Sequence, residues 1–181
     1  MPSRTQVIGL AAALLVAAQP IDATVYYSKQ EALALAFGKG AEVETLALFL
    51  TPEQVRAAEK LARAKLDSKL YTFFVGKRGG VLIGYATIET HTVRTQPETL
   101  LVVLTPEGKL ARVHVLAFHE PPEYQAADRW LARLAELPID ELEANKGIDG
   151  ITGATLTTGA ALAGVRKVLA VYRVGIAKEG P

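Results

Sequence analysis

Residues 70–118 read LYTFFVGKRGGVLIGYATIETHTVRTQPETLLVVLTPEGKLARVHVLAF, and this stretch decides the fold. Four runs within it are rich in β-branched and aromatic residues, a composition typical of strands. The predicted strands are Leu70–Val75, Val81–Ile88, Thr99–Leu104 and Leu110–Phe118. Residues 76–80 and 105–108 contain glycine or proline and predict the hairpin turns between them. Strands that follow one another through hairpins form an antiparallel sheet.

The last of these runs alternates between two kinds of side chain. Small apolar residues occupy every second position, and larger residues, two of them basic or polar, lie between them. Such alternation is what a sheet with two unlike faces requires. The two sets are Val113, Val115 and Ala117, and Arg112, His114 and Leu116. We therefore expect this strand to belong to a sheet with two unlike faces.

A capping pattern predicts a short helix ahead of the sheet. Ser28 and Glu31 have the spacing of a capping box, and the helix that they open is expected to run through Phe37 to Gly38. The apolar residues 43–50 that follow predict a further strand.

A second helix start is clearer. Thr51 is a preferred capping residue, Pro52 suits the first helical position, and Gln54 follows three residues after the cap. One face of the expected helix is apolar. That face consists of Val55, Ala58, Ala62 and Leu66.

Two more apolar stripes predict helices after the sheet. The first consists of Tyr124, Ala127, Leu131 and Leu134, before Pro138. The second consists of Leu162, Val165, Leu169 and Tyr172, and it ends near Gly175. Helices on both sides of an antiparallel meander indicate an α+β domain with a sheet of about four or more strands.

The N-terminus resembles a targeting segment. Arg4 precedes an uncharged apolar run, residues 7–18, which is too short to span a membrane and has the length of a signal-peptide core. We expect residues 1–23 to be a signal peptide or signal anchor, with Ala18 or Ala23 at the cleavage point, and residues 24–181 to be one domain. The alternative is a buried helix at the start of a cytoplasmic domain.

Composition narrows the chemistry. The chain has 20 basic and 19 acidic residues, so its charge gives no indication of nucleic-acid binding. It has no cysteine, which excludes disulfides, thiolate zinc sites, iron–sulfur clusters and c-type haem attachment. Redox chemistry in this protein would therefore need an organic cofactor.

Residues 147–158, GIDGITGATLTT, are the most unusual part of the chain. They predict a glycine-rich loop that leads into a helix N-terminus, where unpaired backbone N–H groups attract phosphate. Neither the dinucleotide-binding fingerprint nor a P-loop is present. The residues alone therefore predict a phosphate-bearing ligand without identifying it, and a capped helix that binds nothing is the alternative.

The segment Asp149–Thr157 also resembles the flavinylation motif of the FMN-binding domain family. That family includes the covalent-flavin subunits of the sodium-translocating quinone reductase and Rnf complexes, and many single-domain envelope proteins. Its pattern is Asp, two variable residues, Ser or Thr, then Gly-Ala-Thr, usually with a hydroxyl residue two positions later. Every position of that pattern matches here.

The resemblance implies a role for each residue of the motif. It implies that Thr155 carries FMN through a phosphoester, installed from FAD by a separate flavin transferase that uses a divalent metal. Asp149 and Gly150 would belong to the motif that the transferase recognises. The remaining expected cofactor-binding residues are Thr152, Gly153, Ala154, Leu156 and Thr157.

A second segment, residues 119–124, extends the resemblance. It stands where related domains carry Glu-Thr-Pro-Gly, in a turn that lies against the flavin ring. Glu120 and Pro121 are therefore candidates for contact with the ring. The alternative is a plain strand-to-helix turn in which Pro122 begins the helix.

The remaining polar residues do not predict a second kind of site. His114 and His119 are expected on opposite sides of one strand, so they cannot hold one metal from that strand. We expect His91 in a hairpin connection and predict no metal site. Glu89 and Glu120 are not expected to form a catalytic pair, and no residue is predicted to be catalytic.

The resulting interpretation is a periplasmic or otherwise extracytoplasmic electron carrier with covalent FMN. Its expected partners are the flavin transferase and a membrane reductase or another redox protein. Alternatives are a module that binds FMN or another phosphate ligand without a covalent bond, and a structural component of an envelope redox complex. An enzyme with its own substrate beside the flavin is a further alternative.

Overall fold

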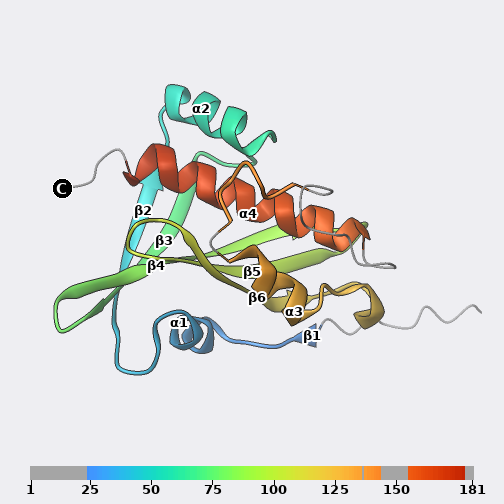
Figure 1. Ribbon diagram of the computed structural model, residues 1–181, viewed down its shortest axis with the longest axis horizontal. Helices are drawn as coiled ribbons and strands as arrows, with labels where there is room; N and C mark the ends of the chain where they lie inside the picture. Colours follow the sequence, from blue (N-terminus) through green and yellow to red (C-terminus); the bar gives the residue numbers. More distant parts are fainter. Residues whose placement is uncertain (1–23, 136, 144–154, 178–181) are drawn as a thin grey trace, which may run out of the picture.

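The computed structural model describes residues 24–135, 137–143 and 155–177 (Figure 1). In chain order the elements are β1 (Thr24–Val25), α1 (Lys29–Phe37), β2 (Glu42–Phe49), α2 (Pro52–Ala62), β3 (Leu70–Arg78), β4 (Val81–Thr92), β5 (Pro97–Leu104), β6 (Leu110–Phe118), the 3-10 helix η1 (Pro122–Tyr124), α3 (Asp128–Leu131), the 3-10 helix η2 (Ala132–Leu134) and α4 (Thr155–Gly175).

The described strands form one antiparallel sheet in the order β1-β6-β5-β4-β3-β2. Strands β3 to β6 are neighbours in the order in which they follow one another in the chain, as the hairpin signals predicted. Strand β2 lies at one edge, and the two-residue strand β1 lies at the other. The prediction of an α+β fold with an antiparallel sheet is confirmed.

Helices cover both faces of the sheet (Figure 1). α4 and α2 lie on one face, with α4 between the sheet and α2, and α1 lies on the opposite face. The larger apolar cluster fills the α4 side and includes Phe73, Leu100 and Val165. A smaller cluster beneath α1 includes Phe37 and Phe74. α4 is therefore largely buried along its length, which fixes its start relative to the sheet.

Both predicted capping boxes are present. Ser28 caps α1 and Thr51 caps α2, each reciprocally with the residue three positions later. The prediction that Leu66 belongs to the apolar face of α2 is wrong. The helix ends at Ala62, since the next residue, Arg63, has a φ of 53° in the left-handed region, and Leu66 packs on the core from beyond the helix.

The first hairpin turn is tighter than predicted. Residues 76–80 were expected to form it, but β3 continues to Arg78 and only Gly79 and Gly80 connect the strands. Their φ values of 57° and 77° belong to the turn that matches the twist of a two-residue hairpin, and glycine reaches them without strain. The strands can therefore pair further than their apolar runs indicated.

The apolar stripe from Tyr124 to Leu134 predicted one continuous helix, and that prediction is wrong. Gln125 and Ala127 have extended backbone conformations, so the segment divides into η1, α3 and η2. The predicted apolar residues Leu131 and Leu134 are nevertheless buried. Hydrophobic spacing predicted which of these residues are inside, but not the broken backbone that places them there.

The alternation predicted for residues 112–117 holds in part. Val113 and Val115 belong to the cluster beneath α4, and Leu116 belongs to the cluster beneath α1. Both faces of β6 are therefore apolar at this level. The two faces differ in which helix covers them and not in polarity alone.

The predicted C-terminal helix is confirmed as α4, and all four residues of its predicted stripe are buried. Residues 1–23, the expected signal segment, lie outside the described residues. Among the residues that are described, none of the helices combines the length and the apolar character needed to cross a bilayer.

Candidate functional site

The head of α4 presents a threonine at the surface. Thr155 is the first residue of this 21-residue helix and is exposed, and Leu156 beside it is 59% exposed. Thr157 and Thr158 are buried, and the hydroxyl of Thr158 donates to the carbonyl of Thr155 at 3.1 Å. A long helix carries about half a positive charge at this end, which favours a phosphate group.

The other residues of the predicted motif divide into two groups. Asp149, Gly150, Thr152, Gly153 and Ala154 lie outside the described residues. Leu156 and Thr157 are described, and their roles toward a cofactor stay predictions. The structure places Thr157 inside the fold and Leu156 outside it, so these two neighbours would approach a ligand at Thr155 differently.

Glu120 holds a turn of the sheet. Its Oε1 accepts hydrogen bonds from the backbone N–H groups of Thr95 at 2.9 Å and Gln96 at 3.1 Å, and from the Thr95 hydroxyl at 3.4 Å. The Thr95 bond is the main cause that lowers the pKa of Glu120. The carboxylate therefore ties the end of β6 to the connection between β4 and β5. Pro121 follows it and is exposed.

These groups lie at one end of the domain. Figure 1 shows α4 beginning at the end of the sheet where β4 and β6 finish. Thr155 and the Glu120–Pro121 turn are therefore presented at the same end. Their predicted contacts with a flavin ring stay predictions.

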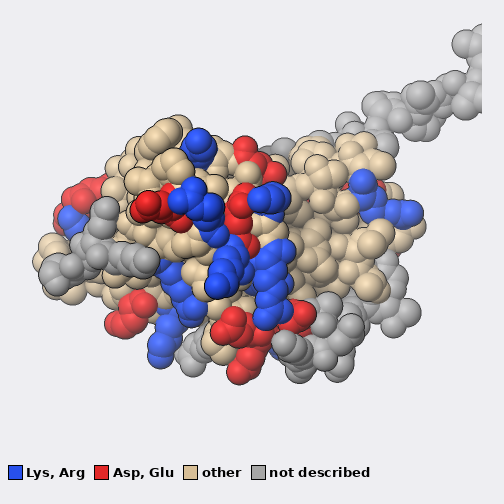
Figure 2. Space-filling model, turned by 90° about the horizontal axis from the view of Figure 1, so that it is seen from above, with Lys and Arg blue, Asp and Glu red and all other residues tan. Residues whose placement is uncertain are grey.

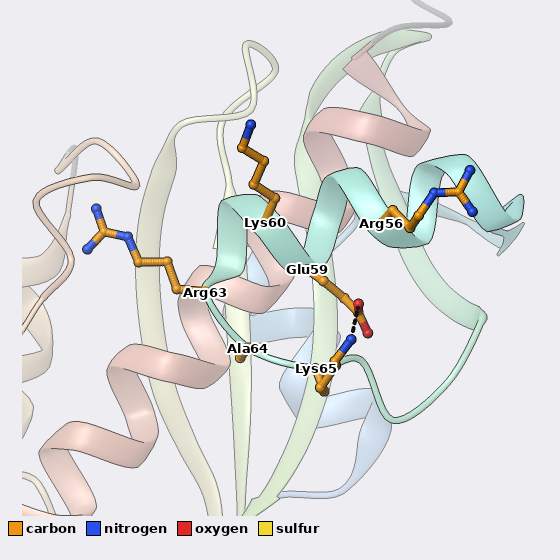
Figure 3. A pocket seen from close by; sticks show the side chains of 6 residues that line it. All are labelled: Arg56, Glu59, Lys60, Arg63, Ala64 and Lys65. Atoms are coloured by element: carbon orange, nitrogen blue, oxygen red, sulfur yellow. Dashed lines mark hydrogen bonds and ion pairs between the residues drawn. The ribbon is translucent and has the colours of Figure 1, made fainter.

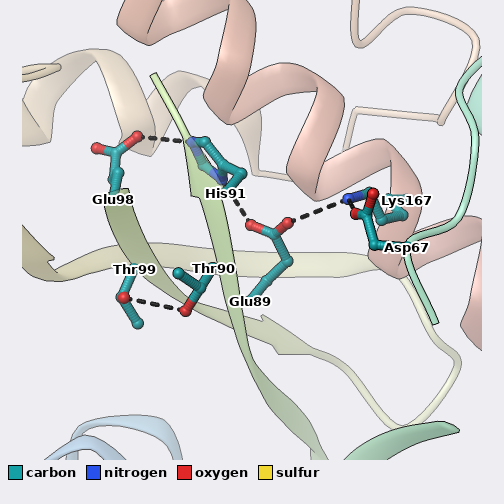
Figure 4. Close-up of polar contacts among 7 residues, drawn as sticks. All are labelled: Asp67, Glu89, Thr90, His91, Glu98, Thr99 and Lys167. Atoms are coloured by element: carbon teal, nitrogen blue, oxygen red, sulfur yellow. Dashed lines mark hydrogen bonds and ion pairs between the residues drawn. The ribbon is translucent and has the colours of Figure 1, made fainter. Parts of the chain in front are cut away.

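A buried charged cluster beneath α4 was not predicted (Figure 4). His91 Nδ1 lies 2.7 Å from Glu89 Oε2, and His91 Nε2 lies 3.0 Å from Glu98 Oε2. Lys167 of α4 joins the cluster, with its Nζ 3.6 Å from Glu89 Oε1 and 2.7 Å from Asp67 Oδ2. The prediction that His91 lies in a hairpin connection is wrong, because β4 continues to Thr92.

The cluster sets the charge state of its histidine. Burial alone would lower the pKa of His91, but the hydrogen bonds to Glu89 and Glu98 and the charges of both carboxylates together raise it to about 9. His91 is therefore an imidazolium at neutral pH. Glu89 Oε1 and Glu98 Oε1 are buried and have no hydrogen-bond partner among the described residues.

Gly164 lets α4 approach this cluster. A Cβ atom at this position would lie 2.6 Å from Glu89 Oε2 and 3.1 Å from His91 Nδ1, so a side chain would displace the carboxylate. A cavity of about 170 Å³ opens beside Glu89 and Lys167, with Tyr71 and Thr87 also in its wall. The cluster thus links β4, β5 and α4, the helix that begins at Thr155.

The sequence contains a signal for this cluster. Glu89 and His91 are two residues apart in a strand, so they share a face, and that face is covered by α4. Charged residues at alternate positions of an otherwise apolar strand indicate a buried polar pair. The third member, Glu98, comes from the pairing of His91 with Glu98 across the hairpin.

Comparison with known protein families identifies the family of residues 95–170. Residues 95–170 match the family model of the FMN-binding domain. The chain contains an FMN-binding domain. The matched range begins at the turn that Glu120 holds, includes β5, β6 and the Asp149–Thr157 motif, and ends within α4.

The FMN-binding domain has FMN as its cofactor, which agrees with the phosphate-attracting start of α4. The exposed Thr155 fits such a group, and among the described residues a Cβ atom at Gly159, one turn later, would meet nothing within 4 Å. The described residues include no group of three His, Cys, Asp or Glu placed to hold a metal. A search of curated proteins found no match to the chain.

Proposed function

We propose that this protein is an extracytoplasmic electron-transfer flavoprotein whose FMN is joined through its phosphate to the hydroxyl of Thr155. The observation that carries the proposal is the FMN-binding domain match, which includes the Asp149–Thr157 motif, together with an exposed threonine as the first residue of α4.

The attachment chemistry balances with FAD as the donor. The Thr155 Oγ1–phosphorus bond forms as the phosphoanhydride bond of FAD breaks, AMP leaves, and the hydroxyl proton passes to solvent. A separate flavin transferase supplies the catalysis, and the motif around Asp149 and Gly150 is its recognition segment. The diester retains one negative charge, which a helix N-terminus stabilises by about 0.3–1 kcal/mol.

The residues of this chain hold the cofactor and do not transform a substrate. The flavin supplies the redox chemistry, while the protein sets its position, its access to water and its potential. Thr152, Gly153, Ala154, Leu156 and Thr157 surround the attachment point in sequence. The Glu120–Pro121 turn at the same end of the sheet is the candidate for ring contact.

The location and the partners belong to the same proposal. The apolar segment at residues 7–18 supports export of the domain across, or anchoring to, the cytoplasmic membrane. A membrane reductase or another redox protein then donates electrons, and an acceptor removes them. Cell fractionation with an epitope-tagged protein tests the location, and recovery in the cytoplasm alone would contradict it.

Expression with and without a flavin transferase tests the covalent bond. With the transferase, the intact denatured protein should gain the mass of FMN less one water, and Thr155→Val should abolish the gain because it removes the hydroxyl and keeps the shape. Thr99→Val, on the sheet, is the matched control and should be modified normally. A yellow protein that loses its colour on denaturation would favour non-covalent binding instead.

A further inference from the structure

The outward face of α2 carries a stripe of basic residues. Arg56 and Lys60 are four residues apart, which puts them on one side of the helix, and Arg63 is the capping residue that follows the helix end; all three are exposed. Figure 3 shows Lys60 pointing away from the Glu59–Lys65 pair, while Arg56 and Arg63 extend toward opposite ends of the helix. A hollow of about 440 Å³ is lined by these three residues together with Glu59, Ala64 and Lys65.

Nearby acids neutralise one of these three charges, that of Arg63. Glu59 is held by Lys65 at 2.8 Å, and Glu143 pairs with Arg63 at 2.6 Å. Within the part of the chain that the structure describes, none of the ion pairs engages Arg56 or Lys60. Like charges at this helical spacing destabilise an isolated helix, so the stripe is not explained by folding.

A further guanidinium lies beneath the stripe. Burial and then the charge of Arg63 lower the pKa of Arg166 on α4, against the charges of Glu143 and Asp140, and its Nη2 is buried without a hydrogen-bond partner among the described residues. Cations from two helices therefore gather at one place on the surface. Figure 2, which views the molecule from the α2 side, shows Lys and Arg side chains concentrated near the middle of this face.

We propose that this basic face, formed by Arg56, Lys60 and Arg63, docks the acidic surface of a protein with which the FMN-binding domain exchanges electrons. The inference rests on the proposed electron-transfer role. Arg166 follows Thr155 by eleven residues of one helix, which corresponds to about 16 Å along its axis. A partner seated on α2 is therefore held beside the helix that bears the cofactor.

A protein fits this face better than a uniformly anionic surface does. Glu53, Glu59 and Glu143 stand among the basic residues, and Figure 2 shows acidic side chains next to the basic ones. A membrane of anionic lipid would repel these acids, whereas a protein surface of mixed charge can complement both signs. The whole chain carries 20 basic and 19 acidic residues, so its net charge would not attract an acidic partner. Such attraction would come from this face.

Binding of a fluorescently labelled glutamate-rich peptide with interspersed lysines tests the inference, since this probe carries the mixed charge of a protein surface. The double variant Arg56→Gln/Lys60→Gln should weaken the affinity roughly tenfold at low salt, because it removes two exposed cations that would each pair with a carboxylate of the probe. Lys39→Gln/Arg129→Gln changes the net charge equally at two exposed sites outside α2 and should leave the affinity unchanged. Wild-type binding should largely disappear in about 1 M salt, where the Debye length is ~3 Å.

Two results would overturn the docking face. One is equal weakening by both double variants, or by neither. The other is tight binding to phosphatidylglycerol vesicles with no binding to the glutamate-rich peptide, which would assign the face to a membrane. Because binding of this peptide needs no flavin, the assay also runs on Thr155→Val protein. Failure to bind by normally flavinylated protein would reject the docking face alone, and an absent flavin would reject only the proposed function.

Discussion

His91 and Glu98 are directly opposite each other on β4 and β5, and their side chains meet at 3.0 Å on the sheet face that α4 covers. Glu98 is fully buried. An unpaired carboxylate at such a position would be strongly destabilising, and the imidazolium between Glu98 and Glu89 offsets this cost. The helix that presents Thr155 is thus seated on a charge cluster and not only on an apolar core.

The stability of the domain should fall at alkaline pH because of this histidine. The pKa of His91 is raised to about 9 in the fold from 6.5, so its contribution is complete below about pH 6.5 and is lost as the pH rises through 9. The shift corresponds to about 3 kcal/mol. Urea unfolding across this range should show the loss in wild type and a flatter profile in His91→Gln. His119→Gln should keep the wild-type slope.

Gly164 should tolerate no side chain. Gly164→Ala would place a Cβ atom 2.6 Å from Glu89 Oε2, and we expect it to lower the free energy of unfolding by about 1–3 kcal/mol. Gly159→Ala is the matched control in the same helix, where the added methyl group meets no atom of the described residues within 4 Å. That change should be neutral or should stabilise by up to ~1 kcal/mol, since alanine favours helix. Equal effects in thermal unfolding would count against the close approach of α4.

Glu120 should control the order of the connection between β4 and β5. In Glu120→Ala the backbone N–H groups of Thr95 and Gln96 lose their acceptor, so their amide hydrogens should exchange faster with solvent. Glu123→Ala, on an exposed neighbour, should leave both rates unchanged. Nuclear magnetic resonance exchange measurements report each amide separately.

The same carboxylate has an acid-side signature. Hydrogen bonds lower the pKa of Glu120 in the fold, so its contribution to stability is present above its ordinary pKa and is lost as the pH falls through the lowered value. Protection of the Thr95 and Gln96 amides should therefore decline in acid in wild type. Persistence of that protection at a pH below the carboxylate's titration would show that another group holds the turn.

Much of the framework could be predicted from local chemistry. The caps at Ser28 and Thr51 are complete within four residues, and the glycines within residues 76–80 predicted a hairpin turn, although not its two-residue length. The start of the C-terminal helix at Thr155 likewise follows from its own apolar stripe and the glycine-rich residues before it. Signals of this kind need no knowledge of the rest of the fold.

Other features depend on long-range geometry and were missed. The His91–Glu98 contact requires the register of β4 against β5, which the connection between them fixes and the apolar pattern does not. The break at Gln125 arises because the chain must turn from β6 into short helices that seat Trp130 and Leu131 in the core. Tertiary packing overrides helical spacing there.

The central claim concerns one oxygen atom, and peptide fragmentation tests it most directly. Trypsin releases residues 147–166 as one peptide that contains four threonines, at positions 152, 155, 157 and 158. In protein made with a flavin transferase, tandem mass spectrometry should place the FMN phosphate on Thr155. Its presence on any of the other three, or an unmodified peptide throughout, would contradict the account.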